Sequence, residues 1–213
     1  MTRRVVLTLA LLTSIPGAGV VLGWNNGANA SPRHPSAKAL DRAMQVRLGL
    51  RPHSQVEPLN SPHCQEAPQG CAARIAALSQ VITQSSLAHR VDPFLTAAIS
   101  WVETRWDPEA VGTIGERGII QLHPRFAGKK VRFVSDPKYR ERCLRRADAC
   151  QREVLNAGLS LYNWAKKKCG NTEKALGWYN TGKCIKSDFS QRVLRERREL
   201  LRLAKLPDET SAN

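Results

Sequence analysis

Glu103 is the first residue whose type and position suggest chemistry. It lies near the end of an apolar stretch, with Ile99 one helical turn before it and Trp106 just beyond it. Such surroundings disfavour the ionised form of a carboxyl group and raise its pKa. A carboxyl that holds its proton near neutral pH can act as a general acid. The alternative is a solvated glutamate near the end of a surface helix, which is the commoner position for this residue type.

The segment after Glu103 predicts a loop that can approach a ligand closely. Glycine permits positive φ angles and close approach of the backbone. Three glycines interrupt the segment, namely Gly112, Gly115 and Gly118. An apolar turn that carries one amide, Gln121, follows them. We expect this loop to pack against a bound ligand beside Glu103.

A helix must position Glu103. Asp92 is placed to cap it, and Pro93 takes the first helical position, where a missing N–H costs nothing. Apolar residues then recur at helical spacing, at Phe94, Leu95, Ala98, Ile99, Trp101 and Val102. We expect the helix to end at Asp107-Pro108, because the residue before a proline avoids the α region. Glu103 then lies in its last turn.

These residues resemble the signature of the soluble lytic transglycosylase family, within the lysozyme-like superfamily. That signature is roughly A-I-x-x-E-S-x-x-x-P-x-A-x-S-x-x-G-A-x-G-L-M-Q-L-x-P. The matching residues here are Ala98-Ile99, Glu103-Thr104, Pro108, Ala110, Gly115 to Leu122 and Pro124. A second family block, rich in tyrosine, is matched by Asn156, Gly158 and Trp178 to Gly182. The resemblance covers roughly residues 72–205 and implies an all-α, lysozyme-like fold around a substrate groove.

The sequence departs from the family signature at several positions of the first block. Thr104 stands where the family has serine, and Gly112 replaces a serine thought to help position the substrate or the acid. Glu116 replaces alanine, and Ile119-Ile120 replaces Leu-Met. The fold prediction tolerates these changes, whereas the details of substrate binding depend on them.

The resemblance implies a mechanism with one glutamate and no cofactor. In that mechanism the acid, here Glu103, protonates the glycosidic oxygen between N-acetylmuramic acid and N-acetylglucosamine in peptidoglycan. The N-acetyl group of the substrate is thought to stabilise the cation. The carboxylate then takes the proton from the muramoyl 6-hydroxyl, which closes a 1,6-anhydro ring.

The resemblance also assigns substrate-binding positions. Gln121 and the backbone around Gly118 and Ile119 are expected to line the groove, with Tyr179 and Asn180 opposite. Tyr179 could hydrogen-bond near Glu103 or to the sugar, or it could be a core aromatic. Asn180 is expected to be mainly structural, in a turn that ends a helix at Gly182. Glu116 is a candidate second carboxylate, or else an exposed substitution.

Three functions therefore stay open. The leading one is a lytic transglycosylase. The second is a hydrolase on the same fold, like goose-type lysozyme, in which water attacks and Glu116 assists. The third is a peptidoglycan-binding protein without turnover, which the replacement of serine by Gly112 makes conceivable and an intact Glu103 argues against.

The N-terminal sequence predicts export. Arg3-Arg4, an apolar run from Val5 to Leu12 and the small-x-small site Ala28-Asn29-Ala30 indicate a signal peptide over residues 1–30, with general secretory and twin-arginine export both open. No later segment is apolar enough to span a membrane. We expect a periplasmic or extracellular protein.

Residues 31–70, rich in Pro, Ser and His, predict a flexible linker with a short helix conceivable at 37–48. The catalytic domain is expected over 71–206, with a tail at 207–213.

The chain is strongly basic, with a formal net charge of +15 that becomes +13 without residues 1–30. For an exported protein, the carboxylates of cell-wall peptides are a better polyanionic partner than nucleic acid. Much of this charge lies in the last predicted helix, residues 191–205. We interpret that helix as amphipathic with a solvated basic face rather than as a binding arm. We expect a monomer.

Six cysteines in an exported chain predict disulfides. Their spacing suggests sequential closure as Cys64–Cys71, Cys143–Cys150 and Cys169–Cys184, out of fifteen conceivable pairings. A metal site is not expected, because zinc sites need Cys-x-x-Cys or tight His/Cys clusters, and the sequence has neither.

The remaining pattern predicts helices and no strand. Helices are expected over 71–88, 138–148, 151–168, 172–179 with Thr172 as cap, and 191–205, with a basic loop at 125–137.

Overall fold

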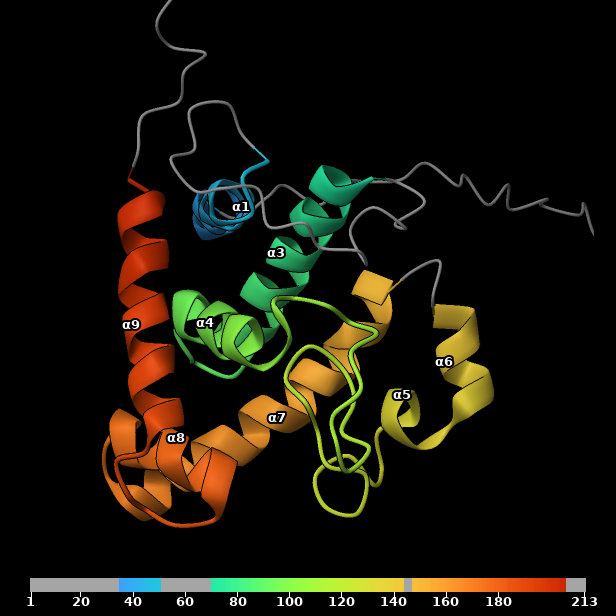
Figure 1. Cartoon of the computed structure of the whole chain (residues 1–213), viewed down its shortest axis with the longest axis vertical. Coiled ribbons are helices and arrows are strands. Elements are labelled where there is room, and N and C mark those ends of the chain that lie inside the picture. Colours follow the sequence, from blue (N-terminus) through green and yellow to red (C-terminus); the bar gives the residue numbers. More distant parts are fainter. Residues whose placement is uncertain (1–34, 51–69, 144–146, 206–213) are drawn as a thin grey trace, which may run out of the picture. The chain divides into compact units, whose positions relative to one another are not determined.

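The computed structural model describes residues 35–50, 70–143 and 147–205 (Figure 1). These residues form helices joined by loops. The helices are α1 (Pro35–Arg47), α3 (Cys71–Ala88), α4 (Pro93–Thr104), α5 (Arg132–Ser135), α6 (Pro137–Cys143), α7 (Ala147–Cys169), α8 (Thr172–Thr181) and α9 (Asp188–Leu203). Within the described residues there is no strand, only isolated bridges from Arg117 to Val111 and to Leu122. The predicted all-α fold is confirmed.

Helix α4 is packed against α9, α3 and α1, which makes it the centre of the domain (Figure 1). Its buried residues include Ala97, Ala98 and Ile99. As predicted, the Asp92 carboxylate caps the helix by accepting a hydrogen bond from the Phe94 amide at 3.0 Å. A polar cap and a continuous apolar face together fix where the last turn of α4 lies.

The end of α4 differs from the prediction. The helix ends at Thr104 rather than at Asp107, because Arg105 and Trp106 both adopt left-handed φ angles, of 54° and 64°. Trp106 is fully buried, and its Nε1 donates a hydrogen bond to the Ala97 carbonyl at 2.8 Å. Burial of this ring turns the chain back early. Glu103 still lies in the last turn, as expected.

The segment expected to be a flexible linker is folded in part. The helix considered conceivable at 37–48 exists as α1. Leu40, Met44 and Leu48 are fully buried in the core, and α1 packs against α3 and α9. The prediction of a linker was therefore wrong for residues 35–48, because this short amphipathic run covers apolar surface that α3 and α9 leave between them. Residues 51–69 lie outside the described part of the chain.

The other helices agree with the sequence except at their ends. Helix α3 has the predicted bounds, whereas the stretch expected to be a basic loop contains the short helix α5. The cap of α8 is Asn171, not Thr172, and its side chain accepts a hydrogen bond from the Lys174 amide. Helix α9 begins at Asp188, where Ser187 and Ser190 form a capping box. Its amphipathic character is confirmed, since Val193, Leu200 and Leu203 are buried.

Two predicted disulfides are present, Cys143–Cys150 and Cys169–Cys184. Cys71 is also disulfide-bonded. Its predicted partner, Cys64, lies outside the described residues. Among the helices of the described ranges, none is long and apolar enough to cross a membrane.

Candidate active site

A cavity of about 720 Å³ brings together most of the residues predicted to form the site. Glu103 comes from the end of α4, Glu116 and Gln121 come from the loop that follows, and Tyr179 and Asn180 come from α8. The end of α4 and the loop that follows it thus meet α8, which is distant in the sequence, at one surface. A volume of several hundred cubic ångströms is typical of ligand sites.

Glu103 is partly buried, and its pKa is raised from 4.5 to about 7. Burial is the largest cause, because a charged carboxylate loses solvation there. The negative charge of Glu116 raises the pKa further, and the positive charge of Arg192 lowers it. A carboxyl with this pKa holds and releases a proton near neutral pH, as the sequence predicted for a general acid.

The loop of residues 111–122 is tied to the helix that carries Glu103. The Thr104 hydroxyl is within donating distance of two carbonyl oxygens. It lies 3.1 Å from that of Ser100, in its own helix, and 3.1 Å from that of Ile119, in the loop. The Ile119 amide donates to Gln151 Oε1 on α7 at 2.9 Å. The loop is therefore held on one side by α4 and on the other by α7, so one part-buried and one buried hydrogen bond fix its position relative to Glu103.

Gln121 lines the cavity in a left-handed conformation, with φ of 48°. Its Nε2 donates to the Ala110 carbonyl at 3.3 Å and to the Gly118 carbonyl at 3.1 Å. These bonds use the amide donors to brace the loop. The side-chain oxygen is left facing the space next to Gly112, because a Cβ atom placed on Gly112 would lie only 2.7 Å from it.

Glu116 occupies the space that a side chain at position 112 would take. A Cβ on Gly112 would lie 2.3 Å from Glu116 Oε2, far closer than real contacts permit. The same Oε2 accepts a hydrogen bond from the Ile114 amide at 3.1 Å. The two departures from the family signature, glycine for serine and glutamate for alanine, are therefore one structural exchange. Glycine at position 112 leaves free the space that the Glu116 carboxylate fills.

Tyr179 joins α8 to the loop. Its hydroxyl donates to the Ile120 carbonyl at 2.7 Å, rather than to Glu103. Burial raises its pKa well above 10, and the Glu103 charge adds to the shift, so the phenol keeps its proton. Its ring stacks on Phe189 with centroids 6.3 Å apart. The side chain therefore lines the cavity as a neutral, fixed wall.

Asn180 is exposed and also lines the cavity. Gly182 follows it in a left-handed conformation, with φ of 74°, and ends α8 as the sequence predicted. The amide is therefore positioned by the turn at the end of a helix. It is open to solvent and to any ligand in the cavity.

Gly118 and Ile119, predicted to line the groove, lie outside the set of residues that border the cavity. Ile119 is fully buried. A Cβ on Gly118 would lie 2.6 Å from Val154 Cγ1, so this glycine lets the loop approach α7. Both residues act on the cavity through the shape of the loop.

Two apolar side chains at the cavity were not predicted from the sequence. Ile114 is 59% exposed and Phe126 is 75% exposed, and both line it. His123 packs against Phe126 with ring centroids 4.6 Å apart. Isolated apolar residues in a loop carry no periodic pattern, so only the fold shows that they gather at one place. Exposed apolar side chains beside carboxyl and amide groups suit the faces and hydroxyls of sugar rings.

The described residues contain no group of three or more His, Cys, Asp and Glu side chains that could hold a metal ion. The polar groups at the cavity include two carboxyls, two amides, two threonine hydroxyls, a histidine and a neutral phenol. One of the carboxyls is protonated over part of the neutral pH range. This arrangement can donate a proton to a leaving oxygen and take one back.

A helical domain with such a glutamate at the end of a central helix belongs to the lysozyme-like class. The family described as Transglycosylase SLT domain matches residues 80–200, more than half of the chain. The chain belongs to this family, so it is a transglycosylase-type enzyme acting on the glycosidic bonds of peptidoglycan, outside the cytoplasm. Comparisons with curated proteins and with solved structures gave no match.

Proposed function

We propose that the protein is a lytic transglycosylase that cleaves the β-1,4 bond between N-acetylmuramic acid and N-acetylglucosamine without water. Glu103 acts first as general acid and then as general base. The observation that supports this role best is the pKa of Glu103 near 7 beside a cavity of ligand size. A group with this pKa is poised to give a proton and to take one at neutral pH.

The steps balance with one glutamate. Protonated Glu103 gives its proton to the glycosidic oxygen as the bond from C1 to that oxygen breaks. The N-acetyl oxygen of the same sugar stabilises the positive charge at C1. The Glu103 carboxylate then removes the proton of the 6-hydroxyl as O6 bonds to C1. The product is a 1,6-anhydro sugar, and the enzyme ends in its starting protonation state.

Substrate positioning is assigned to the groups that line the cavity. Gln121 and Asn180 offer amides to sugar hydroxyl and N-acetyl groups, and Tyr179 forms a fixed wall. Ile114 and Phe126 offer apolar surface to sugar faces. Gly118 and Ile119 support binding indirectly, because they hold the loop against α7.

A second candidate function is hydrolysis on the same fold, and Glu116 is the observation that favours it. Glycoside hydrolases normally use two carboxyl groups, one as acid and one as nucleophile or base. Glu116 lines the same cavity as Glu103, and the two charges interact. In this alternative, Glu116 activates water, and the product has a reducing end.

Mass spectrometry of the products separates these functions. Purified peptidoglycan is digested with the wild-type protein and with its Glu103→Gln variant. Muropeptides lighter by one water, absent with the variant, are expected for the transglycosylase. Reducing-end products would instead identify a hydrolase, and retained binding without any product would leave a peptidoglycan-binding protein.

Export and assembly are further parts of this proposal. We infer that residues 1–30 are removed as a signal peptide and that the mature protein works as a monomer in the periplasm or outside the cell. The disulfides support an oxidising compartment. N-terminal sequencing of the protein recovered from the cell envelope, with light scattering of the purified form, tests both statements.

A further inference from the structure

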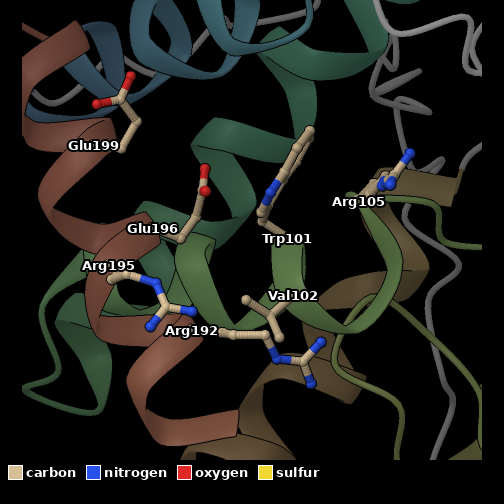
Figure 2. Close-up of a pocket in the computed structure, with 7 residues that line it drawn as sticks. All are labelled: Trp101, Val102, Arg105, Arg192, Arg195, Glu196 and Glu199. Atoms are coloured by element: carbon tan, nitrogen blue, oxygen red, sulfur yellow. The ribbon is translucent and has the colours of Figure 1, made fainter. Parts of the chain in front are cut away.

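A second pocket, of about 370 Å³, lies where the end of α4 meets α9 (Figure 2). Trp101 and Val102 from α4, with Arg105, which follows the helix, form one side of it. The other side consists of residues of α9, namely Arg192, Arg195, Glu196 and Glu199. In Figure 2, Arg192 extends from α9 towards Val102, and the Trp101 ring lies above Val102 in this view. The pocket therefore combines two apolar side chains with a charged rim of arginines and glutamates.

The charges on this rim are unbalanced. Glu196 is already paired with Arg47 at 2.9 Å, and Glu199 is paired with Arg202 at 2.6 Å. By contrast, Arg105, Arg192 and Arg195 form no ion pair or side-chain hydrogen bond with any residue in the described part of the chain. Three guanidinium groups thus surround one pocket with no carboxylate of their own.

The pocket is electrostatically connected to the candidate active site. Val102 and Glu103 are neighbours in the same helical turn, and the charge of Arg192 acts on Glu103. Arg47, at the end of α1, lies over the Trp101 ring, 4.4 Å from its centroid, and is paired with Glu196, so α1 supports two residues that line the pocket. The pocket and the cavity are therefore lined by consecutive residues at the end of α4, Val102 and Glu103.

We propose that this pocket binds a carboxylate of the peptide attached to the glycan strand that occupies the catalytic cavity. The proposal rests on the proposed function, since it takes the substrate to be peptidoglycan. Guanidinium groups bind carboxylates through paired, charge-assisted hydrogen bonds, and the three arginines without a partner in the described ranges provide them. The basic face of α9, interpreted from the sequence as solvated, therefore includes a binding site.

The composition of the pocket favours a peptide over a phosphate polymer. Trp101 and Val102 give apolar surface that suits aliphatic side chains of a peptide. Glu196 and Glu199 can accept hydrogen bonds from peptide N–H or ammonium groups, whereas their charge would repel a dense row of phosphates. A small pocket of mixed charge fits a peptide end that itself carries both charges.

Binding of a soluble muropeptide tests the proposal without turnover. The probe is a disaccharide with its peptide, used with free carboxylates and with amidated ones, and all proteins carry Glu103→Gln. The pocket variant is Arg192→Gln with Arg195→Gln. The matched control is Arg198→Gln with Lys205→Gln, which removes the same charge from exposed positions of α9 and its end that lie outside the pocket.

The pocket variant is expected to bind the free-carboxylate probe about 10-fold more weakly, with little change for the amidated probe. Arg195→Gln alone is expected to lower the affinity for the free-carboxylate probe about threefold. The control pair is expected to lower it by less than about twofold. Equal losses in pocket variant and control, or equal binding of both probes, would overturn the proposal. So would displacement of the probe by oligo(glycerol phosphate) as readily as by a free-carboxylate peptide.

These outcomes differ from a failure of the proposed function. In that case the active protein releases no anhydro product from peptidoglycan, whatever the pocket residues are. If the pocket proposal alone fails, anhydro products form, and the pocket variant binds the probe like its control.

Discussion

The two hollows beside the end of α4 have opposite electrostatic character. The larger one, of about 720 Å³, carries the Glu103 and Glu116 carboxyls. The smaller one, of about 370 Å³, carries three arginines that have no ion-pair partner among the residues that the structure describes (Figure 2). Glu103 is influenced by both, since Glu116 raises its pKa and Arg192 lowers it. Burial makes the largest contribution to the raised pKa of Glu103. The charges of the two regions then change this pKa in opposite directions.

The comparison also shows how each region keeps its charge. In the larger cavity, the Glu116 carboxylate is held by the Ile114 amide, and glycine at position 112 leaves it space. In the smaller pocket, the glutamates are already paired with Arg47 and Arg202, so the remaining arginines stay available. Substitutions that disturb these local arrangements should change one region and leave the other intact.

The largest effect is expected from Glu103→Gln, which removes the proposed acid. General acid–base groups contribute about 10²–10⁴ to rates, so anhydro product release should fall by about 10³-fold. The measurement is the initial rate of muropeptide release, with binding of the amidated probe as control. A variant with more than a tenth of wild-type activity would contradict the role of Glu103.

The same variant should change the dependence of stability on pH. Because the pKa of Glu103 is raised by folding, its contribution to stability is complete below about 4.5 and is lost as pH rises through about 7. Glutamine does not ionise, so the Glu103→Gln variant does not lose this stability as the pH rises. We expect its free energy of unfolding, measured by urea titration, to exceed that of the wild type above pH 7 and to approach it at pH 4.5.

The next largest effect is expected from Gly112→Ser, which restores the family residue but places Cβ 2.3 Å from Glu116 Oε2. Overpacking of this kind costs about 1–3 kcal/mol, and the displaced loop should lower activity about 10-fold. The double variant Gly112→Ser with Glu116→Ala should recover the stability. Urea unfolding and product release measure both effects. If the single variant matches the wild type, the two positions do not share one space.

A smaller effect is expected on the pH profile of kcat/KM. Its alkaline limb, where activity falls as Glu103 loses its proton, reports the pKa of Glu103 in the free enzyme. Glu116→Gln removes a negative charge, so this limb should move to lower pH. Arg192→Gln removes a positive charge, so the limb should move to higher pH. Each shift should be about half a unit to one unit. Shifts in the same direction would mean that the two regions do not act on Glu103 through charge.

Some of this arrangement follows from the sequence, and some requires the fold. Apolar spacing and the Asp92 cap are local features, so they predicted the helix and the placement of Glu103 in its last turn. The left-handed turn at Arg105 depends on burial of Trp106, which no local pattern shows. Helix α1 was underestimated because its short apolar run becomes stable only against α3 and α9.

The relation between sites is harder still to obtain from sequence. Gly112 and Glu116 are visible as separate departures from the family signature, but only their positions show that one makes space for the other. The arginine pocket combines residues near 101–105 with residues near 192–199. A charge pattern along one helix cannot show which of its arginines lack partners, because the partners come from other helices.

The smallest effect is expected at Thr104, which holds the loop of residues 111–122 against α4. Its hydroxyl donates to the Ile119 carbonyl at 3.1 Å, and serine can make the same bond. Thr104→Val removes the donor and should cost about 1 kcal/mol of stability and lower activity about threefold, whereas Thr104→Ser should change neither by as much. Probe binding at the arginine pocket should be unaffected by both, since that pocket does not include the loop. If Thr104→Ser lowers stability and activity as much as Thr104→Val, the contribution of Thr104 comes from packing of its methyl group. The hydrogen bond to Ile119 would then not be what holds the loop against α4.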